Sequence, residues 1–179
     1  VVSIIGINQN EITNNIHLFK AIRFLNDSGN KVILLTTGNL DHQIIKKSII
    51  SDSWIHFEWI PYKEFSKVIS CADVFSLIQI NNLRNNSRFP NKFGDYISAG
   101  RPIITNAVGD LKNYSDNHPD FFYVIDENYD EVLSALQKAY YDWKNNKIYY
   151  KSIRELAENN SWTKRAEKLD EFIKKICVN

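Results

Sequence analysis

Short apolar segments alternate with segments of helical periodicity along most of the chain, and this alternation limits the fold more than any other feature. Six segments rich in β-branched and aromatic residues are predicted strands: residues 1–7, 31–38, 54–60, 72–80, 101–108 and 121–126. Helices are predicted between them, over residues 18–25, 41–50, 62–70 and 91–99. Strands that alternate with helices form parallel sheets with right-handed crossovers. The sequence therefore predicts an α/β fold, a Rossmann-like doubly wound parallel sheet of about six strands with helices on both faces.

The remaining segments are predicted to be loops and C-terminal helices. Residues 81–91 are polar and rich in asparagine, which is typical of a mobile loop, and residues 109–120 are predicted to form a loop with one helical turn. Toward the C-terminus, apolar residues recur at helical spacing on two faces, and both faces are interpreted as surfaces that pack on the core. The first face consists of Val132, Leu136, Ala139, Tyr140 and Trp143, and the second of Trp162, Ala166, Leu169, Ile173 and Ile176.

Length, charge and cysteine content bound the classes of function. A chain of 179 residues favours one domain, here residues 1–179. The net charge of +1 gives no attraction of the whole surface to nucleic acid or anionic lipid, so an anion site would be local. No apolar run approaches the length of about 20 residues that crosses a bilayer, so no transmembrane segment is expected. Cys71 and Cys177 lack metal-binding spacing and are predicted to be free thiols in a reducing compartment. We expect a cytoplasmic location, with a peripheral position at the inner face of the membrane as the alternative for the full-length protein.

The segment that begins at Pro90 contains the main candidate site. Ligands of doubly wound sheets bind at the carboxyl ends of the strands, and this segment follows the fourth predicted strand. Pro90 suits the start of a helix, and Gly100 suits its C-terminal cap. Free N–H groups at a helix start attract anions, and Arg88 and Lys92 add positive charge beside Asn91. The pattern predicts a site for a phosphate or diphosphate.

Asp95 follows this predicted anion site by one helical turn. Its carboxylate could accept two hydrogen bonds from vicinal hydroxyls, as carboxylates do when they bind ribose. Phosphate followed by ribose outlines a nucleotide. The spacing alone leaves a simpler interpretation open, in which Lys92 and Asp95 form an i, i+3 ion pair on a solvated helix face.

Three further candidates lie near predicted strand ends, each with a structural alternative. Tyr62 could stack on a nucleobase or simply follow a strand exit, and Gly38 could let a loop approach a ligand or form an ordinary turn. Gly109 could bring backbone N–H groups to a sugar or form a tight turn. No GxGxxG or GxxxxGK[ST] motif follows a strand, which disfavours dehydrogenase and P-loop functions. The four histidines are dispersed, so no metal site is expected.

Several motifs occur together in a recognisable order. They are ADVFSL at residues 72–77, PNKFGDYISAGRPIIT at 90–105, AVGDL at 107–111 and SWTKRAEKL at 161–169. In these segments the chain resembles the donor-binding half of GT-B glycosyltransferases and is most similar to glycosyltransferase family 4. The resemblance covers nearly the whole chain. It implies the C-terminal lobe of a two-lobe enzyme whose N-terminal acceptor lobe is absent, and the lack of methionine and the abrupt apolar start agree with that expectation.

The resemblance also implies an activity and a site. A nucleotide-sugar such as a UDP- or GDP-sugar would be the substrate, no separate cofactor would be needed, and the acceptor would be a glycan, a surface polysaccharide or a lipid-linked molecule. Transfer would be retaining and independent of metal. Asp95 would bind the ribose, and Asn91, Lys92 and Arg88 would hold the diphosphate and stabilise its charge during catalysis. The isolated lobe would be inactive by itself.

Two positions depart from the family pattern. The Glu-x7-Glu pair has Ser87 in place of its first carboxylate, and the Gly-Arg motif of the first loop is Gly6 followed by Ile7. Some relatives instead carry a Pro-x-Lys helix start, which Pro90 and Lys92 match, so Lys92 is predicted to replace the missing cation. The alternative is a catalytically inactive Rossmann-like nucleotide-binding or scaffold domain.

Overall fold

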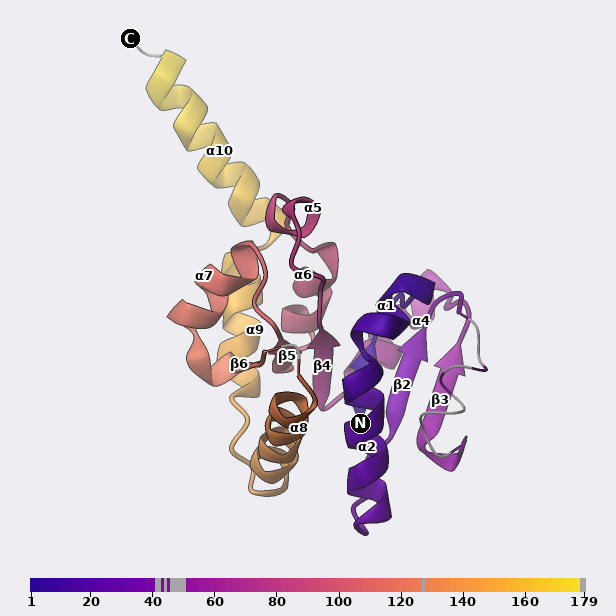
Figure 1. Cartoon of the computed structure of the whole chain (residues 1–179). Coiled ribbons are helices and arrows are strands. Elements are labelled where there is room, and N and C mark those ends of the chain that lie inside the picture. Colours follow the sequence, from indigo (N-terminus) through magenta and orange to yellow (C-terminus); the bar gives the residue numbers. More distant parts are fainter. Residues whose placement is uncertain (41–42, 44, 46–50, 127, 178–179) are drawn as a thin grey trace.

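A computed structural model describes residues 1–40, 43, 45, 51–126 and 128–177. Within these residues a six-stranded, all-parallel sheet has the strand order β3-β2-β1-β4-β5-β6 (Figure 1). The strands are β1 (Val2–Ile4), β2 (Leu34–Thr37), β3 (Trp54–Phe57), β4 (Val74–Leu77), β5 (Ile103–Thr105) and β6 (Phe122–Val124). The predicted doubly wound parallel sheet is confirmed.

Helices cover both faces of the sheet and bury two separate apolar clusters. One cluster joins β-strand residues to α1 (Gln9–Asn14), α2 (Ile16–Asp27) and α8 (Tyr129–Lys144). The other joins the opposite face to α4 (Tyr62–Ser70), α6 (Asn91–Ser98), α7 (Asp110–Asn117) and α9 (Tyr150–Asn159). Neighbouring strand residues alternate between the clusters, as Val74 and Phe75 do, because successive side chains of a strand point to opposite faces. Continuous apolar runs such as the one in β4 are buried on both sides for this reason.

Some predicted boundaries differ from those observed. The predicted helix over residues 41–50 lies mostly outside the described residues. The segment predicted as a mobile loop contains a short helix, α5 (Leu83–Asn86), because the Asn82 side chain accepts a hydrogen bond from the Asn85 N–H and caps the turn. Residues 109–120 form α7 and the 3₁₀ turn η2 (Pro119–Phe121) rather than a single helical turn, and η1 (Ser51–Ser53) precedes β3.

The order of the strands determines where a ligand site can form. Chain connections run in opposite directions from β1 and β4, so the carboxyl ends of these two neighbours border a crevice. The loop that follows β1 and the segment between β4 and α6 both end there. In Figure 1 the carboxyl ends of the strands, α1 and α5 lie at the end of the domain from which α10 projects.

The C-terminal helix α10 (Trp162–Cys177) contradicts its predicted role. Its apolar face does not contact the core: Trp162, Leu169, Ile173 and Ile176 are 48–83% exposed, and α10 extends away from the rest of the chain (Figure 1). Periodicity shows that a helix has an apolar face but not what covers that face. The preceding helix, α9, does pack on the core: it buries Ile153 and Leu156, and it was not predicted from the sequence.

Two other observations concern properties predicted from composition. Both cysteines are free, as predicted, and both are exposed. Among the described residues, no helix combines the length and apolar character needed to span a membrane.

The exposure of α10 predicts a small effect of substitution. Replacing Leu169 and Ile173 together by alanine should change the free energy of unfolding of this domain by less than about 0.5 kcal/mol, because exposed side chains lose little burial. The matched control is Ile153→Ala in α9, where a fully buried side chain is shortened and the expected cost is about 2–5 kcal/mol. Urea denaturation measures both. A loss of 2 kcal/mol or more in the α10 variant would mean that its apolar face is covered in solution.

Candidate functional site

A pocket of about 460 Å³ lies at the carboxyl ends of β1 and β4. We call it the Lys92 pocket. Its lining comes from the segment after β1, the end of β4 and the segment leading into α6: Gly6, Asn8, Glu11, Leu77, Gln79, Arg88, Phe89, Pro90, Asn91 and Lys92. The structure thus brings together Gly6, Arg88, Pro90, Asn91 and Lys92 from the predicted site, and the first is distant from the others in sequence.

The start of α6 faces this pocket with its first turn uncapped by any side chain. Pro90 occupies the N-cap position with φ −75°, and among the residues that the structure describes no side chain caps the helix start. Phe93, Tyr96 and Ile97 are buried on one side of the helix, as predicted, which fixes its direction. Gly100 ends the helix with φ +70°. The exposed N–H groups at Asn91 and Lys92 therefore remain available for an anion.

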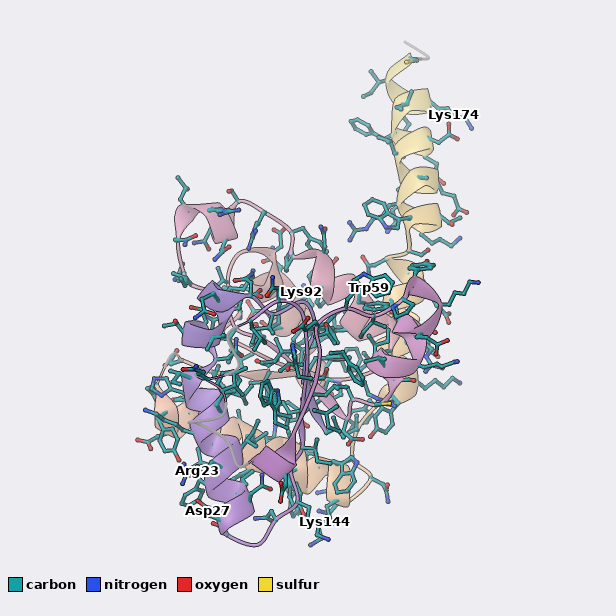
Figure 2. All side chains as sticks on the ribbon, turned by 90° about the vertical axis from the view of Figure 1, so that its right-hand side faces the viewer. Arg23, Asp27, Trp59, Lys92, Lys144 and Lys174 are labelled. Atoms are coloured by element: carbon teal, nitrogen blue, oxygen red, sulfur yellow. The ribbon has the colours of Figure 1, made fainter. Side chains whose placement is uncertain are left out.

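Lys92 is held across the pocket. Its Nζ donates hydrogen bonds to Glu11 Oε1 at 2.6 Å and to the Gly6 carbonyl oxygen at 3.0 Å. The ion pair that the spacing suggested with Asp95 is therefore replaced by one with Glu11. Figure 2 shows Lys92 within the domain near the end from which α10 departs, whereas Arg23, Asp27 and Lys144 lie at the opposite end. The Lys92 ammonium thus lies next to the loop of Gly6 and Ile7, where the Gly-Arg motif of the resembled family has its arginine.

Glu11 is a site residue that the sequence analysis missed. It forms a reciprocal cap with Asn8: the Asn8 N–H donates to Glu11 Oε2 at 3.1 Å, and the Glu11 N–H donates to Asn8 Oδ1 at 3.3 Å. This is a capping box with asparagine at the N-cap position, and the sequence N-Q-N-E at residues 8–11 is its signal. The cap fixes the start of α1 and holds one carboxylate beside Lys92.

Two glycines shape the loop after β1. Gly6 has φ +60°, and its N–H donates to Thr37 Oγ1 at 2.9 Å. Gly38 does not line the Lys92 pocket but packs directly behind it, since a Cβ on Gly38 would lie 2.3 Å from the Ile7 carbonyl oxygen. Gly38 therefore permits the close approach that places Gly6 at the pocket.

Asp95 lies on α6 one turn beyond the lining of the pocket. It is half-buried, and its carboxylate makes no hydrogen bond or ion pair with any residue that the structure describes. Burial raises the pKa of this carboxyl group. An unpartnered carboxylate of this kind has its acceptor capacity available for ligand hydroxyls.

The other predicted site residues lie outside the lining of the Lys92 pocket. Tyr62 is 92% exposed at the first position of α4. Ser87 ends α5, and its hydroxyl donates to the Arg84 carbonyl oxygen at 3.3 Å. Gly109 lies against α5, because its N–H donates to Asn86 Oδ1 at 3.2 Å. The helix α5 thus brings the segments of Ser87 and Gly109 together.

Comparisons with known proteins identify the fold. The chain matches no protein-family model and no curated protein. It is similar to the catalytic domain of cholesterol-α-glucosyltransferase from Helicobacter pylori, with TM-score 0.63, 11% identity, and coverage of 89% of this chain and 98% of that one. It is also similar to the pneumococcal O-GlcNAc transferase GtfA in complex with UDP and GlcNAc, with TM-score 0.71, 14% identity, and coverage of 99% and 36%. For the N-terminal domain of trehalose-6-phosphate phosphatase from Candida albicans the TM-score is 0.65, the identity 11%, and the coverage 97% and 41%. Identities of 11–14% establish the fold alone: this chain has the Rossmann-like α/β fold of a GT-B glycosyltransferase lobe.

Proposed function

We propose that this chain is the nucleotide-sugar-binding domain of a glycosyltransferase. The observation that carries the proposal is the joint arrangement of the Lys92 ammonium and the uncapped start of α6 in one pocket, at the crevice where doubly wound sheets bind their ligands. The fold that it shares with two glycosyltransferases supports the same assignment. One of these, GtfA, was solved with UDP and GlcNAc.

Most of the predicted site residues have a role in this proposal. Lys92, Arg88 and the N–H groups near Asn91 bind the diphosphate in the Lys92 pocket, and Asp95 accepts hydrogen bonds from the ribose hydroxyls. Tyr62 offers an exposed ring for stacking on the base. The glycosyl group of the donor would lie toward Gly109 and Ser87.

Transfer of the glycosyl group would depend mainly on electrostatic stabilisation. As the glycosidic bond breaks, negative charge grows on the leaving diphosphate, so the cations at Lys92 and Arg88 would interact more strongly with the transition state than with the bound donor. We assign this charge neutralisation to the side-chain cations of Lys92 and Arg88 rather than to a metal ion. A retaining outcome and a cytoplasmic site of reaction belong to the same proposal.

The acceptor would bind to a further lobe of the enzyme. The chain spans 36% of the length of GtfA and 41% of the fungal domain, so a domain of this fold can be one part of a larger molecule. We propose that a glycan, surface-polysaccharide or lipid-linked acceptor binds to that lobe. The exposed apolar face of α10 is available to contact it.

One observation favours a second candidate function, an inactive nucleotide-binding or scaffold domain. Ser87 supplies no carboxylate to a sugar, and its hydroxyl is engaged with the Arg84 carbonyl oxygen. Incubating the full-length protein with a nucleotide-sugar and acceptor distinguishes the two functions. A glycosyltransferase releases free nucleoside diphosphate, whereas a scaffold does not.

Binding of nucleotides by this domain tests the proposal. We expect UDP or GDP, or one of their sugars, to stabilise the domain by about 2.7 kcal/mol at 100 times the dissociation constant. This corresponds to a rise in Tm of about 5–10 °C for a domain of this size. We expect Asp95→Asn to weaken the same binding about tenfold, since hydrogen bonds to a charged group contribute about 1.5–3 kcal/mol.

The pH dependence of Asp95 separates its binding role from a structural one. Because burial raises the pKa of Asp95 in the folded domain, its contribution to stability is present at low pH and is lost as pH rises through the raised pKa. Without ligand, Asp95→Asn should therefore have a higher Tm than the wild type at pH 7. The control is Asp116→Asn on α7, an exposed acid paired with Lys112. Unchanged nucleotide affinity in Asp95→Asn would refute the ribose role, and no stabilisation by any nucleotide would refute the proposed function.

A further inference from the structure

Tyr96 lies one turn of α6 after Lys92 and does not line the Lys92 pocket. The spacing of four residues puts the two side chains on the same side of the helix. The Tyr96 side chain is fully buried, and its ring stacks on that of Phe75 in β4, with centroids 4.0 Å apart and 1° between the planes. Tyr96 can therefore act on a ligand only through other residues.

The Tyr96 hydroxyl takes the place of a strand partner where β1 and β4 separate. The Val2 N–H is bonded to β2, so the alternation along a strand turns the N–H groups of Ser3 and Ile5 toward β4. The register that pairs β1 with β4 ends at Ser3. Beyond it, the Ile5 N–H donates to the Tyr96 hydroxyl oxygen at 3.1 Å, in the buried interior. The α6 helix thus supplies the partner that β4 does not.

Two consecutive residues after β1 are therefore bonded to α6. Tyr96 accepts from the Ile5 N–H, and Lys92 Nζ donates to the Gly6 carbonyl oxygen at 3.0 Å. The inner contact is buried, and because burial raises the pKa of the Tyr96 hydroxyl it stays neutral at physiological pH. The outer contact is charged and partly exposed, and its ammonium also pairs with Glu11. A diphosphate that binds this ammonium must share or replace its present partners, so it weakens the outer contact and leaves the inner one intact.

We propose that Tyr96 is the positioning residue of the anion site: through the Ile5 N–H it holds the start of α6 against the segment after β1 while Lys92 binds the ligand. The proposal rests on the proposed function and adds to it a residue outside the pocket. Gly6 lines one side of the pocket and the start of α6 the other. The donors of an anion site must converge, because hydrogen bonds weaken steeply as distance and angle depart from the optimum. A change in the separation of these two segments would move the donors apart.

Tyr96→Phe is the test variant, since phenylalanine keeps the ring that stacks on Phe75 and removes only the hydroxyl. Tyr123→Phe is the matched control. It removes the hydroxyl of another buried tyrosine, which donates to Asp142 Oδ2 at 3.1 Å, and Tyr123 lies on β6, outside the lining of the pocket. Calorimetry well below the Tm of both variants should show dissociation constants of UDP and GDP raised at least fivefold by Tyr96→Phe and less than twofold by Tyr123→Phe. Equal effects of the two variants on binding would mean that Tyr96 only stabilises the fold, and would overturn the proposal.

Amide hydrogen exchange of the wild type tests the same contact without any variant. With saturating UDP or GDP, the Ile5 amide should be protected at least as strongly as in the free domain, because the inner contact persists when the ligand binds. Faster exchange of the Ile5 amide in the bound state would show that the contact opens, and the positioning role would be wrong.

Inorganic pyrophosphate separates this proposal from the proposed function, since it contains the diphosphate without base or ribose. If nucleotides bind and Tyr96→Phe does not weaken their binding, the positioning role alone is overturned. If pyrophosphate binds, and binds at least fivefold more weakly to Tyr96→Phe, while no nucleotide binds, the proposed function is overturned and the positioning role stands. Binding of neither ligand overturns both.

Discussion

Replacing Gly38 by alanine is expected to destabilise the domain by about 2–6 kcal/mol and to abolish nucleotide binding. The loss of stability has two sources: backbone strain costs about 1–3 kcal/mol, and overpacking costs about 1–3 kcal/mol more. Gly38 has φ +124°, and the added Cβ would lie 2.3 Å from the Ile7 carbonyl oxygen and 2.9 Å from the Ile7 nitrogen. The obstacle is backbone, so no side-chain rotation relieves it. Relief requires the loop of Gly6 and Ile7 to move, and Gly6 lines the Lys92 pocket. Urea denaturation and calorimetry with UDP and GDP measure the two effects.

Two other glycines serve as controls for this substitution. Gly29 also has a positive φ, +84°, but a Cβ there has no neighbour within 4 Å, so Gly29→Ala carries the strain without the collision. Gly94 lies in α6 with an ordinary φ and equally open space, and Gly94→Ala should stabilise the domain by about 0.5–1 kcal/mol. If Gly38→Ala costs no more than Gly29→Ala and still binds nucleotide, the loop after β1 is free to move and the pocket does not depend on its close packing.

The parts of the fold that the sequence predicted are those encoded by local patterns. The helix over residues 91–98 is marked by Pro90 at its start, Gly100 at its end and an apolar face with i, i+3, i+4 spacing between them. Strands such as β2 and β4 lie within short apolar runs of the kind buried in a parallel sheet, whereas β3 lies in an alternating segment and is only partly buried. These signals act over a few residues and need no tertiary information, so the alternation of strands with helices and the start of α6 followed from them. The shared pocket of Gly6, Arg88 and Lys92 followed in turn from the rule that ligands bind at the carboxyl ends of strands.

The parts that were missed depend on contacts between distant segments. Lys92 pairs with Glu11, 81 residues earlier in the chain, so its spacing from Asp95 gave no information about its partner. The α10 helix carries the same apolar periodicity as α8, yet α8 buries Val132 and Leu136, whereas α10 buries none of its residues. What decides the difference is whether another surface lies opposite the apolar face, and periodicity does not contain that information.

The ion pair between Lys92 and Glu11 leads to two opposite predictions for one pocket. A diphosphate that binds Lys92 must share or replace the Glu11 carboxylate, which holds Nζ at 2.6 Å. We expect Lys92→Ala to weaken binding of UDP or GDP about tenfold or more, because a hydrogen bond between charged groups contributes about 1.5–3 kcal/mol. We expect Glu11→Gln to strengthen binding about threefold to tenfold, because it removes a negative charge from the anion site while glutamine can still accept the Asn8 N–H in the capping box.

Calorimetry at two salt concentrations measures both effects, and the salt dependence should fall in Lys92→Ala, since one cationic contact is lost. The ion pair is partly exposed, with the two side chains 27% and 28% accessible, so either variant should lose less than about 1 kcal/mol of stability and remain folded. The control is Lys112→Ala, which removes an exposed lysine from α7. If Glu11→Gln weakens binding as much as Lys92→Ala does, Glu11 does not compete with the diphosphate. Its carboxylate would then serve to orient the Lys92 ammonium toward the ligand, and the resting ion pair would be part of the bound state rather than its substitute.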